Sequence, residues 1–375
     1  MADQPNRSSA PGAAPDLVVV GGGIVGLAVA RALANEGLTV TLVERDRPGA
    51  ESSWAAAGML IPLGESEEGP FRELVLASHR AWPLWARELE ADAERSVDFR
   101  AGGRMVLALD EPRAEALREG VRALARSGHA VEWLDAATAR AREPGLAEAV
   151  RGAALHLEDA HVDNRRVGPA LEAAALRVGV RVERAEARSL HIQHGRIQGV
   201  HLLDGRLLPT PRVVVAAGAW SGQLEGVHPG LAVRPVRGRM IALRPPGPLP
   251  ERILDTGTVY LVPRGGRILV GATMEDAGFD RSPDPRASAA LLAGAVAALP
   301  DLAGLPLDEE WQGFRPGTPD GLPYLGPDPA TEGLFYATGH FRNGILLAPL
   351  TAALLRDLVL GRSVESPPAF RVDRG

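Results

Sequence analysis

The sequence contains no cysteine and no lysine, and each absence narrows the chemistry. Without cysteine there is no disulfide framework, no thiolate-bound metal, no iron–sulfur cluster and no cysteinyl-linked flavin. Without lysine there is no Schiff-base chemistry, which excludes pyridoxal phosphate. No apolar stretch is long enough to cross a membrane, since the longest candidate, 288–299, is Ala-rich and too short. No pairing of histidines or carboxylates at metal-ligand spacing occurs either, so we expect no metal.

Length and charge set further bounds. The chain has 375 residues, which suits two domains with sizeable cores. The net charge is −6 and no basic stripe is present, so nucleic acid is not expected as a partner. Residues 1–15 are small and polar without an apolar segment, and we expect a disordered lead-in there and not a secretory signal. These features favour a cytoplasmic enzyme without a membrane partner.

The clearest motif lies near the N-terminus, where the apolar run Leu17–Val20 is followed by G-x-G-x-x-G. Gly21 permits a tight turn from strand to helix, and Gly23 lets backbone N–H groups approach a pyrophosphate. Gly26 lets the helix predicted over 24–35 pack closely on the sheet. The helix N-terminus favours an anion. This pattern predicts a dinucleotide site, and the alternative is a tight turn without a ligand.

The segments that follow indicate which dinucleotide is bound. A second apolar run, 38–43, ends in Glu44, where a carboxylate would accept both hydroxyls of an adenosine ribose. A strand-like run at 213–220 ends in a small-residue turn, and 334–347 repeats the strand–Gly–helix pattern, so both segments return the chain to this first unit. A nicotinamide enzyme needs no such distant segment, whereas a flavin protein must hold its ring far from the adenosine. A helix beginning near 343–344 would direct its positive end at the flavin N1/C2=O region. FAD is therefore the expected cofactor.

The remaining pattern predicts an α/β chain with two interleaved domains. We expect a Rossmann-like FAD-binding domain over 16–85, 150–225 and 308–375. We expect a discontinuous antiparallel-sheet substrate domain over 86–149 and 226–307. Between them, the runs 180–185, 189–193 and 199–203 are typical of a small antiparallel set.

Five side chains near the C-terminal half are candidates for the substrate site. Arg315 lies between Gly- and Pro-rich turns, where its planar fork would meet a carboxylate bidentately; alternatively, it ties down turn carbonyls. Tyr260 would add a second hydrogen bond, although a lone tyrosine is often a core or rim residue. Met274 would form an apolar wall or simply pack. Arg342 and His340 stand at the start of the predicted cofactor helix.

The chain resembles the D-amino acid oxidase superfamily in six motifs: GGGIVG, SSWAAAGML, VVVAAGAWS, YLVPRGGRILVGATM, GFRPGTPDGLPYLG and ATGHFRNGILLAP. The last three together are similar to glycine oxidase of the thiazole (thiamin) pathway. The resemblance implies the fold shared with p-hydroxybenzoate hydroxylase and a non-covalent FAD. It also implies oxidation of glycine, sarcosine or small D-amino acids, with O₂ becoming H₂O₂. A homo-oligomer is implied too, while transfer of the product to a thiazole-synthesis partner stays open.

The resemblance also assigns roles to residues by motif match. The substrate carboxylate would be bound by Arg315 and Tyr260, with Arg342 nearby and Met274 lining the pocket. From composition alone, the segment with Ser52 and Ser53 suits either a loop along the cofactor or an ordinary turn into a helix. The residues expected to hold FAD are Gly21, Gly23, Ile24, Val25, Gly26, Glu44, Arg45, Ser52, Ser53, Ala57, Gly58, Met59, Arg188, His340, Phe341, Arg342, Asn343, Gly344, Ile345 and Leu346.

Three positions depart from the family pattern. Thr258 stands where some relatives carry histidine, and Ile61 where a smaller residue is often found. Ala55 stands where related sarcosine and dimethylglycine dehydrogenases carry a histidine that bonds to FAD, which favours a dissociable flavin.

Several alternatives remain within and beyond this family. They are sarcosine oxidase, a D-amino acid dehydrogenase with a membrane acceptor, a non-catalytic flavin-binding assembly protein and a domain of an RNA-modifying flavoenzyme. The absence of a membrane-binding stretch argues against the dehydrogenase. Retention of Arg315, Tyr260 and Arg342 argues against the assembly protein, and the acidic charge balance argues against the RNA enzyme.

Overall fold

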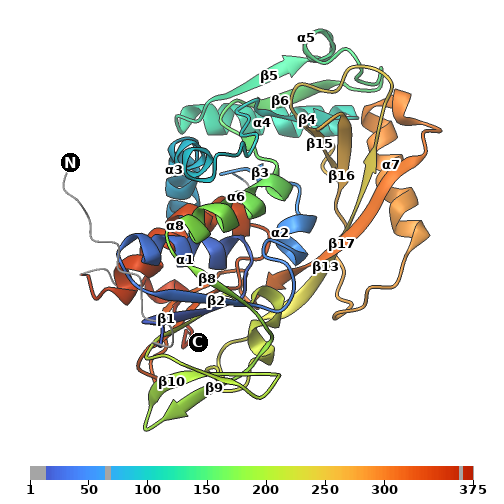
Figure 1. Cartoon of the computed structure of the whole chain (residues 1–375). Coiled ribbons are helices and arrows are strands. Elements are labelled where there is room, and N and C mark those ends of the chain that lie inside the picture. The colour runs from blue at the N-terminus through green and yellow to red at the C-terminus, as the bar shows by residue number, and fades with distance from the viewer. Residues whose placement is uncertain (1–13, 64–68, 363–365, 375) are drawn as a thin grey trace.

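A computed structural model describes residues 14–63, 69–362 and 366–374. Most of the predicted lead-in over 1–15 lies outside the described residues. Two large sheets form the body of the protein, and helices cover them (Figure 1). Among the helices of the described ranges, none has the length and hydropathy that a bilayer-crossing segment requires.

The six-stranded sheet is mostly parallel and has the order β18-β19-β12-β1-β2-β8. Only β18 runs antiparallel to its neighbour. The strands that it contains are β1 (Leu17–Val20), β2 (Val40–Glu44), β8 (Arg181–Arg184), β12 (Val213–Val215), β18 (Tyr324–Pro327) and β19 (Leu334–Thr338).

Helices and a small sheet cover the two faces of this six-stranded sheet. On one face Leu17 and Val19 pack among four helices, and on the other Val18 and Val20 pack against a three-stranded antiparallel sheet. Figure 1 shows these two layers above and below β1 and β2. A central strand buried on both faces explains the uninterrupted apolar run in the sequence. The covering elements are α1 (Ile24–Asn35), α3 (Pro70–Ala93), α6 (Asn164–Arg177), α8 (Gly344–Val359), β9 (Ala187–Gln193), β10 (Arg196–Leu202) and β11 (Leu207–Pro209).

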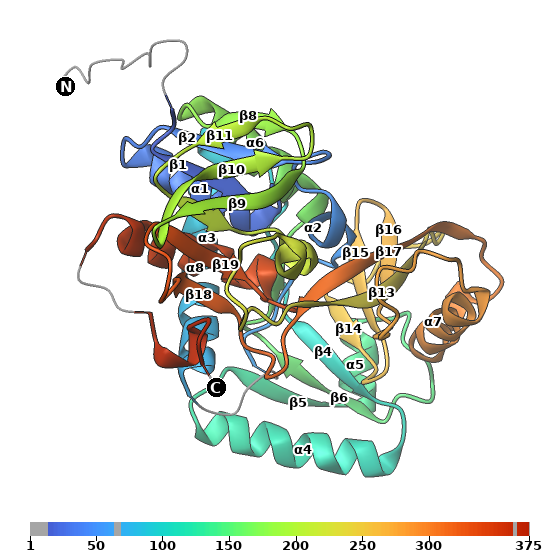
Figure 2. The same cartoon turned by 90° about the horizontal axis from the view of Figure 1, so that it is seen from below.

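The eight-stranded sheet has the order β17-β13-β16-β15-β14-β4-β6-β5, and only the pair β14–β4 is parallel. Figure 2 shows α4 and α7 beside it. Its strands and helices are β4 (Arg104–Ala108), α4 (Glu111–Arg126), β5 (Val131–Asp135), α5 (Ala136–Arg142), β6 (Gly152–His156), β13 (Arg234–Leu243), β14 (Ile253–Asp255), β15 (Tyr260–Arg264), β16 (Arg267–Gly271), α7 (Pro285–Ala298) and β17 (Leu307–Gly317).

Short elements connect the two halves. A two-stranded sheet is formed by β3 and β7, and α2 precedes β3. The predicted loop along the cofactor therefore contains a helix, so Ser52 and Ser53 lie on α2 and not in a loop. These elements are α2 (Glu51–Ala55), β3 (Met59–Leu60), β7 (Ala160–His161), η1 (Gly218–Gln223), η2 (Pro300–Leu302) and η3 (Pro368–Phe370).

The strand pairing corrects one sequence-based grouping. The run 180–185 does not join the antiparallel set, because β8 pairs in parallel with β2. Helix α6 directly precedes β8 and supplies the crossover that a parallel neighbour requires. β6 and β17, which lie in ranges that we assign to the cofactor domain, belong to the eight-stranded sheet, and the division into domains stays a prediction.

Candidate active site

A cavity of about 1070 Å³ is lined by residues of both large sheets. Its walls include the β1–α1 turn, α2 and β3, the start of α8, and one face of the eight-stranded sheet. Of the site residues expected from the sequence, all line this cavity except Gly26 and Leu346. Segments from both ends of the chain and from its middle thus meet at one place.

The β1–α1 turn is shaped by glycines that leave no room for side chains. Gly21 has a φ of +107°, and a Cβ there would lie 2.5 Å from the carbonyl oxygen of Ala216. A Cβ on Gly26 would lie 1.9 Å from the carbonyl oxygen of Gly21. Gly26 is therefore not a wall of the cavity; it lies behind the turn, where it lets α1 approach the sheet.

Glu44 and Ser53 are fixed at this end of the cavity by backbone amides. The Glu44 carboxylate accepts hydrogen bonds from the N–H of Gly22 at 2.7 Å and of Asp46 at 3.0 Å. Ser53 Oγ accepts from the N–H of Ile24 at 3.0 Å, which joins α2 to the first turn of α1. A carboxylate has about four acceptor positions, so Glu44 retains capacity for a ligand hydroxyl.

An aromatic stack lies beside Glu44. The Arg45 guanidinium lies 4.0 Å from the centre of the Trp220 ring. Trp220 lines the cavity and stacks on Phe279 with centroids 4.7 Å apart. Trp220 was not singled out from the sequence, because nothing local shows that its ring faces the turn at Arg45. Arg188 also lines the cavity, at the start of the three-stranded sheet.

The start of α8 forms another wall. Asn343 precedes the helix, and His340 lies just before it with only 3% of its surface exposed. Burial lowers the pKa of His340 to about 4, and its Nε2 lies 3.0 Å from Thr351 Oγ1. The ring is thus neutral near pH 7. Leu346 does not line the cavity, and its carbonyl accepts hydrogen bonds from Trp82 Nε1 at 3.0 Å and from Ser78 Oγ.

Arg315 and Tyr260 meet on the cavity face of the eight-stranded sheet. Arg315 Nη1 donates to the carbonyl of Thr273 at 3.1 Å. A Cβ on Gly238 would lie 2.3 Å from Arg315 Nη1, and a Cβ on Gly271 would lie 2.7 Å from the Tyr260 hydroxyl. Two glycines thus provide the space that the guanidinium and the phenol occupy.

Burial governs the electrostatics of this pair. Burial raises the pKa of Tyr260 and lowers the pKa of Arg315, and each residue partly offsets the other's shift. The positive charge of Arg342 lowers the pKa of both Tyr260 and Arg315, so Arg342 lies near both residues. Met274 lines the cavity with 65% of its surface exposed, so it stands at the mouth and not in the core.

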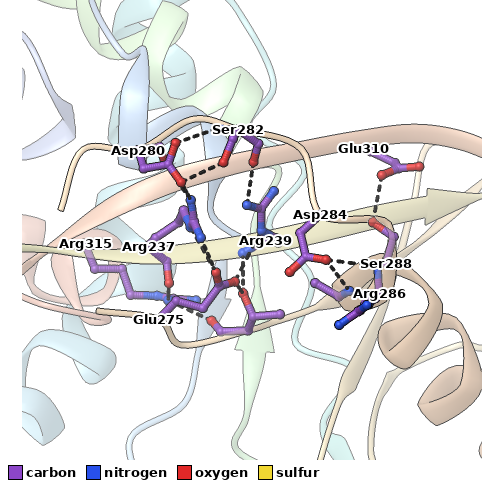
Figure 3. A network of polar contacts seen from close by, with 12 residues as sticks. Arg237, Arg239, Glu275, Asp280, Ser282, Asp284, Arg286, Ser288, Glu310 and Arg315 are labelled. Carbon is purple, nitrogen blue, oxygen red and sulfur yellow. Dashed lines mark hydrogen bonds and ion pairs between the residues drawn. The ribbon is translucent and has the colours of Figure 1, made fainter. Parts of the chain in front are cut away.

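A polar network holds the chain that follows Thr273 against β13 (Figure 3). The Glu275 carboxylate accepts from Arg237 Nη2 at 2.6 Å and from Thr273 Oγ1 at 2.5 Å. Arg237 Nη1 also donates to Asp280 Oδ2 at 2.7 Å, and Arg239 Nη2 donates to the Ser282 carbonyl at 2.6 Å. These contacts fix the backbone whose Thr273 carbonyl receives Arg315.

One buried cluster at the cavity was missed by sequence reasoning. Arg104 lines the cavity and donates to Asp159 Oδ2 and Asp255 Oδ2, both at 2.7 Å. Burial raises the pKa of Asp159 to about 6, although Arg104 opposes the shift. Arg104 and Asp255 lie at strand ends and Asp159 lies in the short turn between β6 and β7, far apart in the sequence, so no local signal marks them. Within the described part of the chain, no group of three or more His, Asp or Glu side chains suits a metal ion.

The residues present fit a dinucleotide. Helices α1 and α8 both begin at the cavity, and neither has an acidic residue in its first turn that would compete with an anion. The glycine turn admits close approach of a phosphate, and Glu44 stands at the end of β2. The far end of the cavity has the buried cation Arg315.

The chain belongs to the FAD dependent oxidoreductase family, which matches residues 16–358. This confirms the predicted fold class and identifies the protein as an enzyme with FAD as its cofactor. It is 36% identical over 358 residues to the glycine oxidase of Pseudomonas aeruginosa, covering 94% of this chain and 97% of that protein.

Other relatives place the chain within this family. The crystal structure of glycine oxidase from Geobacillus kaustophilus matches with a TM-score of 0.90 and 34% identity, over 96% of this chain and 99% of that one. The bifunctional protein ThiO/ThiG of Synechocystis is 38% identical over 360 residues, which cover 93% of this chain and 52% of that protein. The chain thus spans about half the length of this relative.

Proposed function

We propose that this enzyme oxidises glycine, and also sarcosine and small D-amino acids, to the imino acid, with O₂ becoming H₂O₂. The imino acid then hydrolyses to glyoxylate or another 2-oxo acid and ammonia or an amine. The observation that carries the proposal is the buried Arg315 beside Tyr260, on a wall of the cavity that also contains the dinucleotide turn. The names of the relatives from Pseudomonas aeruginosa and Geobacillus kaustophilus support it.

Arg315 suits the substrate carboxylate because its contacts leave its charge unneutralised. Arg315 donates to the carbonyls of Arg237 and Thr273 and interacts with the Tyr260 hydroxyl, and all three groups are neutral. Among the described residues no carboxylate is hydrogen-bonded to Arg315, and Glu275 offsets the cost of burying its charge only in part, so an incoming carboxylate would reduce that cost further. The Tyr260 hydroxyl, which interacts with Arg315 and lies 3.9 Å from Met240 Sδ, supplies a second donor.

Positioning is the main contribution of these side chains. When bound, FAD supplies a hydride acceptor for the substrate Cα–H and passes the electrons to O₂. Arg315 and Tyr260 hold the carboxylate so that the Cα–H is directed at the cofactor, an effect that can supply several kcal/mol. Neither His340 nor Asp255 removes the amine proton, because His340 is buried and bonded to Thr351 and Asp255 is paired with Arg104. Solvent therefore takes it.

Two finer proposals follow from the resemblance and from the double name ThiO/ThiG of longer relatives. The first is that the product passes to a separate thiazole-forming partner. The second is that the chain assembles as a homo-oligomer, which light scattering of the purified protein would measure.

The experiment that tests the function mixes the purified holoenzyme with glycine without air and follows the flavin absorbance before air is admitted. Bleaching, followed by recovery with peroxide, is the expected result. Bleaching without recovery in air would instead indicate a dehydrogenase. Bleaching with sarcosine or D-alanine but not with glycine would indicate a different substrate. Thr258 and Ile61, which both line the cavity, would then be the residues expected to determine the specificity.

Arg315→Ala tests the carboxylate role directly. Loss of a charge-assisted bidentate contact should raise KM for glycine about 100-fold, while the FAD content stays the same. Arg244→Ala is the matched control, because Arg244 is an exposed arginine at the end of β13 outside the cavity. An unchanged KM in Arg315→Ala would remove Arg315 from this role.

A further inference from the structure

The cavity segment 53–59 is held from behind by side chains of three other elements. Asn164, at the start of α6, donates from Nδ2 to the carbonyls of Ser53 at 2.7 Å and Trp54 at 2.9 Å. Trp311 of β17 donates from Nε1 to the carbonyl of Ala55 at 2.8 Å. These donors satisfy the carbonyls at the end of the short helix α2, which has no regular continuation.

Arg264 of β15 extends this support to the segment that follows. Its Nη2 donates to the carbonyls of Ala57 and Val162, and its Nη1 donates to Asn164 Oδ1 at 2.6 Å. The guanidinium is only 3% exposed and does not line the cavity. Arg264 and Asn164 therefore form one buried unit behind the cavity wall.

The contact with Ala57 sets the direction of one peptide group. In a trans peptide, the C=O and the following N–H point in opposite directions. Because the Ala57 carbonyl points at the buried guanidinium, the N–H of Gly58 points away from it, towards the cavity that Ala57 and Gly58 both line. Within the described residues, no hydrogen-bond acceptor for this N–H is recorded.

The geometry points to Arg264, together with Asn164, as a positioning residue that presents the Gly58 N–H to an acceptor atom of the FAD ring system. The glycine is required at this point, because a Cβ on Gly58 would lie 2.1 Å from the Val162 carbonyl and 2.8 Å from Arg264 Nη2. The inference rests on FAD as the cofactor and not on the identity of the substrate.

The energetics of Arg264 agree with a functional role. Among the described residues its Nε has no hydrogen-bond partner, and Asp163 Oδ1 lies 3.9 Å from it. Burial lowers the pKa of Arg264 to about 10. An arginine held at such cost behind a cofactor wall also places positive charge near the cavity, which favours an electron-rich ligand.

Arg264→Met provides the main test. We measure the thermal midpoint of the protein with and without saturating FAD, because the increment due to FAD reports binding to the folded state. The variant should lose much of this increment and bind FAD about tenfold more weakly, with an altered absorbance spectrum of the bound flavin. Arg264→Lys, which keeps the charge but not the planar fork, should lie between the variant and the parent.

Arg252→Met is the control for loss of a partly buried, ion-paired arginine. Arg252 pairs with Glu143 at 2.9 Å in the same half of the protein and does not line the cavity. This control should lower the midpoint with and without FAD equally, which is what a merely structural role predicts.

Asn164→Asp keeps the test decisive if Arg264→Met does not fold. The aspartate still accepts from Arg264 but cannot donate to the carbonyls of Ser53 and Trp54, so the FAD increment should again fall. A parental FAD increment and a parental flavin spectrum in Asn164→Asp and Arg264→Lys would overturn the proposal. None of these measurements uses turnover, so an enzyme inactive on glycine would leave this inference standing.

Discussion

The two large sheets contribute to the cavity in different ways. The six-stranded sheet presents backbone, namely a glycine turn and the starts of α1 and α8, and its site is made at the ends of strands. The eight-stranded sheet presents side chains that stand on its face, above all Arg315 and Tyr260. The part of the cavity formed by backbone has no room for an added side chain. The part formed by side chains depends on the register between strands that are distant in sequence.

The largest effect should come from breaking the backbone site with Gly26→Ala. The new Cβ would lie 1.9 Å from the Gly21 carbonyl oxygen, so α1 must move away from β1. We expect a loss of about 3 kcal/mol or more in the free energy of unfolding and a protein purified without FAD. Urea unfolding and flavin content measure this.

Gly120→Ala controls for the substitution itself. Gly120 lies on α4 with no atom within 4 Å of the position of its Cβ, so alanine should stabilise the protein by about 0.5–1 kcal/mol. Parental stability and FAD content in Gly26→Ala would contradict the backbone account.

Gly238→Ala tests the eight-stranded sheet, because it disturbs a side chain of the cavity and leaves the glycine turn intact. Here the Cβ would displace the Arg315 guanidinium, whose Nη1 lies 2.3 Å from its position. KM for the substrate should rise about 10- to 100-fold while FAD remains bound, because only the side-chain site is disturbed. Steady-state kinetics and flavin content separate the two effects. Gly247→Ala, in open space after β13, should change neither.

A histidine at the junction of the two halves gives a pH-dependent effect. Both ring nitrogens of His161 are buried, and neither has a hydrogen-bond partner in the described part of the chain. Burial and, to a smaller extent, Arg264 and Arg100 lower its pKa to about 4, while Asp98 opposes the shift. The folded state thus binds fewer protons than the unfolded state, so stability is full above about pH 6.5 and falls as pH drops towards 4.

His161→Leu should remove part of this loss, about 2 kcal/mol between pH 7 and 4.5. Urea unfolding at the two pH values measures it. The buried His156 and His340, whose pKa values are also lowered to about 4, should retain the remaining slope. The exposed His194, substituted by Gln, is the control. An unchanged slope in His161→Leu would refute the assignment.

The smallest effect is expected where the two halves meet at the surface. Arg281 forms two contacts of 2.8 Å with the Glu51 carboxylate on α2, but its side chain is 51% exposed. Arg281→Gln should therefore change the free energy of unfolding by less than about 1 kcal/mol, and salt should shrink the difference further. A larger change would mean that this contact, and not the buried carbonyl supports, holds α2.

The same contrast explains what the sequence predicts. The helix over 24–35 and the glycine turn are local patterns, and the predicted bounds of α1 agree with the structure. The partners of Arg264 lie 100 residues or more away in the sequence. The local sequence around Asn164 predicts only the start of a helix. Their meeting depends on packing between the two sheets. The prediction that 180–185 joins the antiparallel set was wrong for the same reason, because the half-exposed pattern of β8 does not reveal its parallel partner β2.

The order of strands in the six-stranded sheet has a consequence for biosynthesis. β1 pairs with β12, and β12 pairs with β19, so the centre of the sheet joins residues from both ends of the chain. A ribosome adds about 5–20 residues per second, so β19 follows β1 by roughly 15–60 s. During that interval the nascent chain exposes an apolar strand edge and has no α8 to complete the cofactor site. Free FAD can therefore assist only the last stage of folding, and we expect the unfinished chain to depend on chaperones.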